Sequence, residues 1–303
     1  MRALLIADAN SSIGWGHVMR VTALGEKLVQ RGHSVVLRTS SLPQPLEDVM
    51  RSRGIEVVET SVELLRTIDA IRADCVVVDD YDPVRWFATR KIANPVTVIQ
   101  ICDSGTNSFL DEAILVRPDP LRSPGDRSVI GGIEYLLIGS DVVDFPRVPP
   151  EGRAGVFVSL GGSARDLEEK LTSELTTNHG VTAISGFSLM SNSSIGRSDF
   201  VHGLASARLA IVGSGTAVWE CGYLRTPLVA VCLAQNQEAQ WRWISNHKLG
   251  IAVSLEKLLD FLLEIDRALS AETPLTEMAE RFGRLVDGRG SERIAQLIES
   301  HCG

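Results

Sequence analysis

The sequence predicts an α/β protein with two domains, each built on a parallel β-sheet. Short, almost continuously apolar segments alternate with stretches whose apolar residues have helical spacing, a pattern typical of parallel strands covered by helices on both faces. Residues 145–155 interrupt the pattern with three prolines and two glycines, after which it begins again. A length of 303 residues, 44% of them apolar, suffices for two hydrophobic cores.

The first expected domain comprises residues 1–148. It begins with the apolar run 3–7, which indicates a buried strand. The apolar residues that follow have helical spacing as far as Gly32, a residue type that commonly ends helices. The same reasoning predicts further strands at 33–39, 55–60, 74–81 and 95–103, and helices at 44–54 and 61–73.

The second expected domain comprises residues 149–272, and residues 273–303 form C-terminal helices that we expect to pack back toward the first domain. The C-terminal helical pattern is broken near 287–290, where the sequence reads DGRG. Strands are predicted at 155–162, 180–186, 208–215 and 227–233, with helices over 167–175, near 203–207 and over 218–224.

Composition excludes several classes of protein. The formal net charge of −8 argues against general binding of nucleic acids or anionic membranes, which requires clustered Lys and Arg. The five cysteines are widely spaced and form no CxxC, so we expect free thiols in a reducing compartment. No apolar run approaches the roughly 20 residues of a membrane span, and the N-terminus shows no signal-peptide pattern. We therefore expect a cytoplasmic protein; the sequence leaves its oligomeric state open.

Site residues are expected where the strands end. Ligands of parallel α/β sheets bind beyond the carboxyl ends of the strands, and in a two-domain protein of this class the two sets of ends face one cleft. The first such segment, residues 13–20, reads IGWGHVMR. Gly14 and Gly16 allow a tight turn and close approach of a ligand, but the segment lacks the GxGxxG pattern of dinucleotide sites. His17 can serve either as a cap of this turn or as a reactive group.

The fourth expected strand ends in Asp79, Asp80 and Tyr81. Acids at a buried strand end can orient a neighbouring histidine or bind sugar hydroxyls, or they can simply be solvated. The sequence contains no HxxxH and no triad of acids with metal-ligand spacing, so we expect neither a metal nor another cofactor.

Three polar segments follow strands of the second half. Gly162 and Ser163 follow one strand, and Ser214, Gly215 and Thr216 follow another and lead into a helix. The backbone N–H groups at that helix start suit a diphosphate. Glu220, one turn into the helix, can accept hydrogen bonds from two ribose hydroxyls or can serve only as a partner of the helix dipole. Asn236 and Gln237 carry neutral amides suited to sugar or phosphate recognition, or to capping a helix.

These segments together resemble a known family. The stretches IGWGHVMR, VVVDDYD, VSLGG, SARLAIVGSGTAVWECGYLRTPLVAV, LAQNQ and DGRGSERIA occur in the order found in the UDP-sugar hydrolases of pseudaminic acid biosynthesis, which act on a 2,4-diacetamido-2,4,6-trideoxy-altrose and have relatives among spore-coat polysaccharide proteins. That family is similar to the lipid II N-acetylglucosaminyltransferase and shares its GT-B fold of two Rossmann-like domains. The resemblance covers most of the chain.

The resemblance implies an enzyme that needs no metal and breaks the anomeric C–O bond of a nucleotide sugar, most simply a UDP-sugar, with inversion. It implies that His17 activates the attacking water, and either Asp8 or Asp80 could orient the imidazole. It places Ser214, Gly215, Thr216 and Glu220 around the nucleotide, and Asn236 and Gln237 near the sugar and phosphates. Arg20, one turn after His17, is expected to neighbour the same site.

The sequence departs from the family at several places. Asp80 stands where the family usually has His, Cys102 where it often has Asp, and Gly139 where it has Arg; its Gly-Gly-x-Asp motif is stretched over residues 161–166. Most of these changes lie in the first half, which holds the sugar in this fold, so the sugar itself stays open.

Alternatives to the hydrolase also stay open. The same groups would suit an inverting GT-B glycosyltransferase in which an alcohol or amine replaces the water. A non-catalytic nucleotide-sugar-binding partner would not need His17. A 2-epimerase would need acids for proton removal at C2, which the sequence does not reveal.

Overall fold

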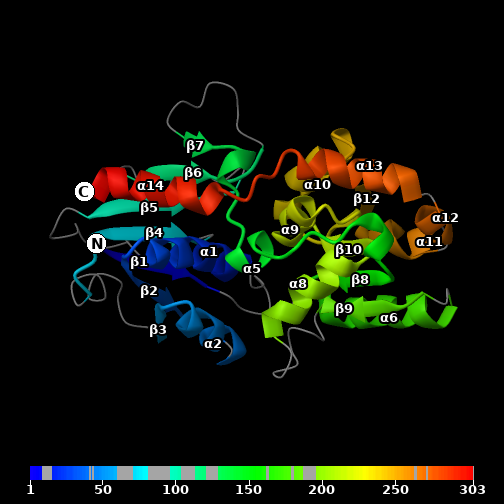
Figure 1. The fold of residues 1–303 in the computed structure, drawn as a ribbon, viewed down its shortest axis with the longest axis horizontal. Coiled ribbons are helices and arrows are strands. Elements are labelled where there is room, and N and C mark those ends of the chain that lie inside the picture. The colour runs from blue at the N-terminus through cyan, green and yellow to red at the C-terminus, as the bar shows by residue number, and fades with distance from the viewer. Residues whose placement is uncertain are drawn as a thin grey trace. The chain divides into compact units, whose positions relative to one another are not determined.

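The structure, a computed structural model, divides the chain into two compact units. One unit consists of residues 1–139 and 288–303, and the other of residues 140–287 (Figure 1). The described residues are 1–8, 16–40, 42, 44–59, 71–80, 96–103, 113–120, 129–161, 164–178, 181–186, 196–262, 265–270 and 272–302.

Seven strands of the described chain form one sheet in the first unit, in the order β3-β2-β1-β4-β5-β6-β7. Every neighbouring pair is parallel, and β1 and β4 lie inside the sheet. The strands are β1 (Arg2–Ala7), β2 (Ser34–Thr39), β3 (Ile55–Glu59), β4 (Cys75–Asp79), β5 (Thr97–Ile101), β6 (Ile114–Arg117) and β7 (Val129–Gly131).

The apolar strands place the core of this unit. Leu4 and Ile6 of β1 and Val76 and Val78 of β4 are fully buried and share one cluster, because a central parallel strand is covered on both faces. The register pairs Ala7 with Asp79, so the residues after β1 and at the end of β4 reach the same edge. The helical elements are α1 (Gly16–Gln30), α2 (Gln44–Ser52), the 3-10 turn η1 (Ile133–Tyr135) and α14 (Gly290–Cys302).

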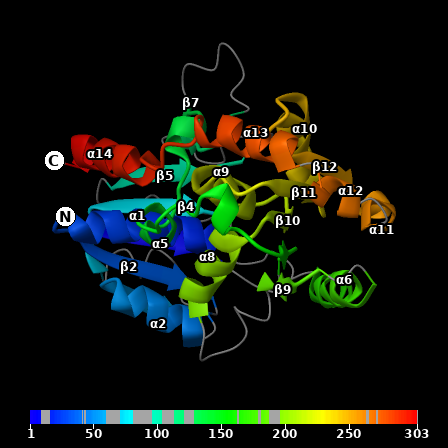
Figure 2. The ribbon, with the colours of Figure 1, turned by 45° about the vertical axis from the view of Figure 1, so that its right-hand side comes forward.

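The C-terminal helix α14 lies beside α1 in the first unit, as Figures 1 and 2 show. Arg31, just after α1, donates to Glu299 through Nε and Nη2 at 2.8 and 2.5 Å and to Glu292 at 2.6 Å. His33 lies 2.8 Å from Glu299. Hydrogen bonds from Arg31 and His33 lower the pKa of Glu299 to about 2. These contacts connect the last helix of the chain to its first.

The second unit contains a five-stranded parallel sheet in the described residues, with the order β12-β11-β10-β8-β9. Its central strands are mostly apolar, and their buried residues pack into one cluster with Leu171 and Leu175 of α6. The strands are β8 (Val156–Ser159), β9 (Ala183–Ser185), β10 (Leu209–Gly213), β11 (Leu228–Cys232) and β12 (Ile251–Ser254).

The helices of this unit connect the strands, and α9 follows β10 and packs against α13. Gly222 of α9 faces Phe282, whose ring atoms lie 2.9 Å from where a Cβ would stand, so only glycine allows this approach. The helices are α5 (Ser140–Val143), α6 (Arg165–Asn178), α8 (Gly196–Ser206), α9 (Ala217–Leu224), α10 (Glu238–Asn246), α11 (Leu258–Leu262), α12 (Ile265–Ser270) and α13 (Glu272–Gly283), with 3-10 turns η2 (Pro150–Gly152), η4 (Gln235–Gln237) and η5 (Leu255–Lys257).

The predicted fold class, α/β with two parallel sheets, is confirmed. The units differ in extent from the expected domains of residues 1–148 and 149–272. Residues 140–148 group with the second unit, and of the C-terminal helices only α14 groups with the first. Three short strands, β6, β7 and β12, were not expected from the sequence. Most of the helix expected at 61–73 lies outside the described residues.

Two further expectations concern compartment and membrane. All five cysteines are free thiols, as their spacing predicts. Within the described part of the chain, no helix combines the length and the apolar character needed to cross a membrane.

Replacement of Gly290 by alanine tests how α14 is seated. A Cβ at this position would lie 2.1 Å from the backbone oxygen of Leu136, so the helix must shift away from η1. We expect Gly290→Ala to lower the free energy of unfolding by about 1–3 kcal/mol, measured by urea denaturation. Gln296→Ala, on an exposed position of the same helix, is the control and should change it by less than about 0.5 kcal/mol. Equal stability of the two variants would contradict this packing.

Candidate functional site

His17 is the second residue of α1, and its imidazole is largely buried, with 7% of the residue exposed. Its Nδ1 lies 2.6 Å from Oδ1 of Asp79. Asp79 is the last residue of β4 and is 1% exposed. The contact joins residues 62 positions apart, because β4 lies next to β1 in the sheet and α1 follows β1.

Asp79 is ionised in this environment. Burial alone would raise the pKa of its carboxyl, but the charges and hydrogen bonds of Arg20 and His17 outweigh burial and lower it to about 2. An ionised carboxylate can only accept hydrogen bonds. Nδ1 of His17 therefore carries the hydrogen and donates it to Asp79, and in the neutral imidazole Nε2 is the nitrogen that can take a proton.

Arg20 lies one helical turn after His17 and joins the carboxylates at this edge of the sheet. It donates to both oxygens of Asp79, through Nε to Oδ2 and through Nη2 to Oδ1 at 2.6 Å. Its Nη1 donates to Asp103, beyond the end of β5, at 2.7 Å. Burial opposes the charge of Arg20, yet the two carboxylates hold its pKa well above the ordinary value. The guanidinium thus stays charged and fixes Asp79 in the orientation that meets His17.

The carboxylate that contacts His17 is not one of the two that the sequence analysis favours, and this corrects that interpretation. Asp8 and Asp80 were the candidates to orient the imidazole, and the structure places Asp79 there instead. Asp8 accepts hydrogen bonds from the backbone N–H and the hydroxyl of Ser40, at 2.8 and 2.9 Å. Asp80 follows the end of β4 and is half-buried. The spacing of Arg20 from His17, three residues on one helix, places both on the same face and could have indicated a shared acid.

Of the two glycines and the tyrosine expected beside His17, the structure describes one glycine. Gly16 is the first residue of α1. Gly14 and Tyr81 lie outside the described residues, as do Gly162 and Ser163 in the second unit.

In the second unit, Ser214, Gly215 and Thr216 connect β10 to α9. Gly215 and Thr216 are partly exposed, as is Ala217 at the start of the helix. The side chain of Thr216 makes no capping hydrogen bond to α9. Ser214 is buried, and its hydroxyl oxygen has no hydrogen-bond partner among the described residues. The backbone N–H groups of Ser214 and Gly215 donate to Val231 and Gly213. The N–H groups that suit an anion are therefore those at the start of α9, from Thr216 onward.

The segment after β11 lies against this loop. Gln240 Nε2 donates to the backbone oxygen of Gly215 at 2.9 Å, and Gln237 Nε2 lies 3.9 Å from where a Cβ of Gly215 would stand. Gln237 also accepts a hydrogen bond from the backbone of Leu233 at 3.1 Å. The structure thus brings Gly215 and Gln237 together, with Asn236 exposed on the same 3-10 turn.

Glu220 is buried in α9, and one of its oxygens accepts a hydrogen bond from Nη2 of Arg197. Arg197 comes from α8 and also donates through Nε to Asp141 of α5 at 2.6 Å. Burial raises the pKa of the Glu220 carboxyl, and Arg197 opposes that rise. The sequence did not single out Arg197, because nothing in its local pattern links α8 to α9.

Among the described residues, no group of three His, Cys, Asp or Glu side chains is placed to hold a metal ion. The expectation that no metal or cofactor is needed stays a prediction.

Comparison with known proteins identifies the fold. No protein-family model matches the chain, and no curated protein matches its sequence. Among solved structures, MurG of Acinetobacter baumannii is 15% identical, covers 99% of both chains and has a TM-score of 0.66. CalG4, the calicheamicin glycosyltransferase, is 16% identical over 99% of this chain and 98% of its own, with a TM-score of 0.63. The Streptomyces sp. SF2575 glycosyltransferase SsfS6, complexed with thymidine diphosphate, is 13% identical over 99% of each chain, with a TM-score of 0.63.

These likenesses show that the chain shares the fold of the glycosyltransferases, the GT-B fold of two parallel sheets with helices. The expected fold is therefore confirmed. The resemblance to the pseudaminic acid pathway hydrolases stays a prediction.

Asp79 links stability to pH. Because its pKa falls from 3.8 to about 2 on folding, its charge stabilises the fold above about pH 4 and this contribution, about 2 kcal/mol, is lost as pH falls toward 2. Asp79→Asn removes the carboxylate that accepts two hydrogen bonds from the buried Arg20, so we expect a loss of about 3–5 kcal/mol at pH 7 and a flatter stability profile between pH 4 and 2. Urea denaturation at several pH values measures both.

Asp103→Asn is the matched control. Asp103 is 30% exposed and accepts only one of the hydrogen bonds of Arg20, so its loss should cost about 1 kcal/mol or less at pH 7. An equal loss of unfolding free energy in the two variants would show that Arg20 does not depend more on Asp79 than on Asp103.

Proposed function

We propose that this chain is a glycosyltransferase that uses a nucleotide sugar and inverts the configuration at the anomeric carbon. The observation that carries the proposal is the hydrogen bond between His17 and the ionised Asp79. A histidine held in this tautomer is a general base, and Asp79 stabilises the imidazolium that forms. The fold shared with CalG4 and SsfS6, both named as glycosyltransferases, supports transfer to an acceptor.

The proposed reaction has one displacement step. Nε2 of His17 takes the proton from an acceptor hydroxyl or amine as the acceptor atom bonds to the anomeric carbon. The bond from that carbon to the phosphate oxygen breaks, and the nucleoside diphosphate leaves with the electron pair. The N–H groups at the start of α9 stabilise its negative charge without a metal.

Glu220 is the proposed partner of the ribose. Its Oε1 stays with Arg197, and Oε2 would accept from a ribose hydroxyl. Burial raises the pKa of this carboxyl and Arg197 opposes the rise. The ionised form, which Arg197 stabilises, accepts such hydrogen bonds most strongly. Asn236 and Gln237 are proposed to contact the sugar or the phosphates.

A nucleotide-sugar hydrolase is the second candidate, favoured by the resemblance of IGWGHVMR and the following segments to the hydrolase family. Water would then replace the acceptor at the same base. UDP is the nucleotide that this resemblance implies, whereas the SsfS6 structure contains thymidine diphosphate; both belong in the test.

Release of nucleoside diphosphate from UDP-, dTDP-, GDP- and CMP-sugars, with CMP measured for the last, distinguishes these functions. We expect slow release in water alone and a large increase with one member of a panel of sugar and lipid-linked acceptors. Full-rate release that no acceptor accelerates would establish the hydrolase. Tight nucleotide binding without any turnover would overturn both enzymes in favour of a binding protein.

His17→Ala should lower the turnover number by about 10²–10⁴-fold, because the base is lost, and should leave the dissociation constant of the nucleotide unchanged in calorimetry. His301→Ala, an exposed histidine near the end of α14, should keep full activity. A His17→Ala enzyme that turns over normally would remove this residue from the mechanism.

Glu220→Gln tests the ribose contact. The wild-type protein should bind UDP more tightly than 2′,3′-dideoxy-UDP, and the variant should lose about tenfold of that preference. Glu238→Gln, at an exposed ion pair of α10, is the control and should keep the preference. Equal discrimination by Glu220→Gln and the wild-type protein would place the ribose elsewhere.

A further inference from the structure

Two of the free cysteines lie next to each other in the first unit, although they are far apart in the sequence. Cys75 is the first residue of β4 and is fully buried. Cys302 is the last residue of α14 and is partly exposed. The two thiols are close enough for a side-chain hydrogen bond between them. The fold therefore brings together a buried thiol and a thiol that solvent can reach.

The backbone places this pair independently of the thiols. The register of the sheet pairs Cys75 with Thr97, the first residue of β5. The hydroxyl of Thr97 donates to the backbone oxygen of His301 at 3.2 Å, and His301 directly precedes Cys302. Helix α14 lies against β5 (Figure 1). The end of α14 is thus attached to the strand next to Cys75, at the edge of the sheet where β4 and β5 begin.

The surroundings of Cys75 disfavour its thiolate. Burial raises the pKa of the Cys75 thiol, and the neighbouring thiol of Cys302 raises it further. A thiolate that its surroundings stabilise favours the reduced form of a thiol pair. Cys75 lacks that stabilisation, so its environment does not hold the pair in the reduced state.

The contacts that seat α14 on the first unit are otherwise noncovalent. The ion pairs of Arg31 with Glu292 and Glu299 are partly exposed, and exposed ion pairs weaken as salt rises. The chain reaches α14 only after it has passed through the second unit, residues 140–287. A covalent bond at the end of α14 would therefore close a loop that contains the whole of that unit.

We propose that Cys75 and Cys302 form a redox modification site, at which hydrogen peroxide converts the thiol pair into a reversible disulfide that ties the end of α14 to the start of β4. This inference does not rest on the proposed function. It concerns a reaction of the folded protein, in which all five cysteines start as free thiols.

The proposed reaction has two steps. The partly exposed Cys302 meets the peroxide first, takes one oxygen atom and becomes a sulfenic acid, while the peroxide is reduced to water. The sulfur of Cys75 then attacks the sulfur of Cys302. The S–S bond forms, the S–O bond breaks, and the hydroxyl leaves as water with the proton of Cys75. A dithiol reductant reverses the change by forming its own disulfide.

The test treats the full chain with a small excess of hydrogen peroxide at pH 8.5, where the attacking sulfur ionises more readily. Free thiols are counted, and tryptic peptides are analysed by mass spectrometry with and without dithiothreitol. Cys302→Ser removes the partly exposed thiol and Cys75→Ala the buried one. Cys232→Ser is the matched control, because Cys232 is also partly exposed but lies on β11 and donates to the backbone oxygen of Ala234. Circular dichroism of the reduced proteins checks that the variants fold.

We expect the wild-type protein and Cys232→Ser to yield a peptide in which residues 73–85 are joined to the peptide that begins at Ile294. Dithiothreitol should separate the two peptides and restore both thiols. Cys302→Ser and Cys75→Ala should yield no such linked peptide. The linked wild-type protein should unfold at a higher urea concentration than its reduced form, because the cross-link restricts the unfolded chain.

Conversion of Cys302 to a sulfinic acid without any link to Cys75 would overturn the proposal, because two thiols in contact react with each other before a second oxygen is added. A Cys302 thiol that peroxide leaves unchanged would overturn it too. So would a link that lowers the urea concentration of unfolding, because such a link would form only by displacing α14 from its native position.

Discussion

The ionised carboxylate of Asp79 is the constraint on which the candidate site of the first unit depends. It lies buried at the end of a central strand, where an unpaired charge would be very costly. Arg20 compensates it by donating to both oxygens. This in turn fixes the orientation of the carboxylate and, through it, the tautomer of His17. The position of the proton on the imidazole thus follows from the register between β1 and β4, which sets where Asp79 stands relative to the start of α1.

Both units place one buried arginine between two carboxylates. Arg20 lies between Asp79 and Asp103, and Arg197 between Glu220 and Asp141. Each arginine holds one carboxylate in the orientation that the proposed chemistry uses. Beside His17 this carboxylate is Asp79, which accepts the hydrogen bond of the imidazole. In the second unit it is Glu220, whose oxygens suit hydroxyl donors and repel phosphate, so a diphosphate would bind at the start of α9, where the helix dipole is positive. Ribose and phosphate would therefore be separated along one helix.

Local pattern predicted the long apolar strands, because β1, β4, β10 and β11 are continuous buried runs. It did not predict β7 and β12, which have three and four residues and are stabilised by pairing with neighbours. The candidate base, His17, could be predicted because it follows a strand. The acid that contacts it could not, because the choice between Asp79 and Asp80 depends on strand register. The ion pair of Glu220 could not be predicted either, because it depends on the packing of α8. The segment 145–155, expected as the linker between the two domains, lies inside the second unit, where Arg153 packs it onto α9.

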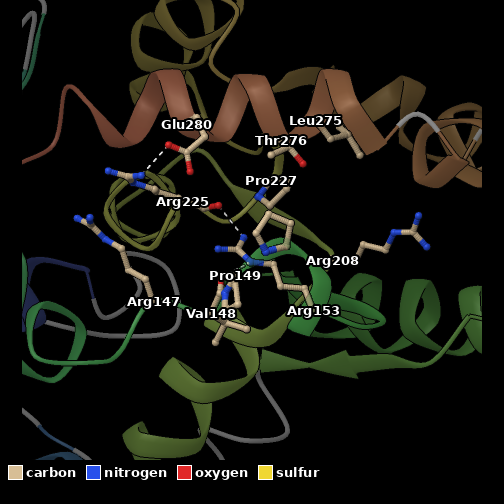
Figure 3. A pocket seen from close by; sticks show the side chains of 11 residues that line it. Arg147, Val148, Pro149, Arg153, Arg208, Arg225, Pro227, Leu275, Thr276 and Glu280 are labelled. Atoms are coloured by element: carbon tan, nitrogen blue, oxygen red, sulfur yellow. Dashed lines mark hydrogen bonds and ion pairs between the residues drawn. The ribbon is translucent and has the colours of Figure 1, made fainter.

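The carboxyl end of α9 explains why arginines gather beside it. Arg153 donates to the backbone oxygens of Leu224 and Arg225 (Figure 3), which otherwise lack partners within a helix. Arg147 donates to the backbone oxygen of Tyr223, in the last turn of the same helix. Arg208 donates to the backbone oxygen of Leu269, near the end of α12. Guanidiniums suit this role because they donate several hydrogen bonds and carry the charge that the negative end of a helix dipole favours.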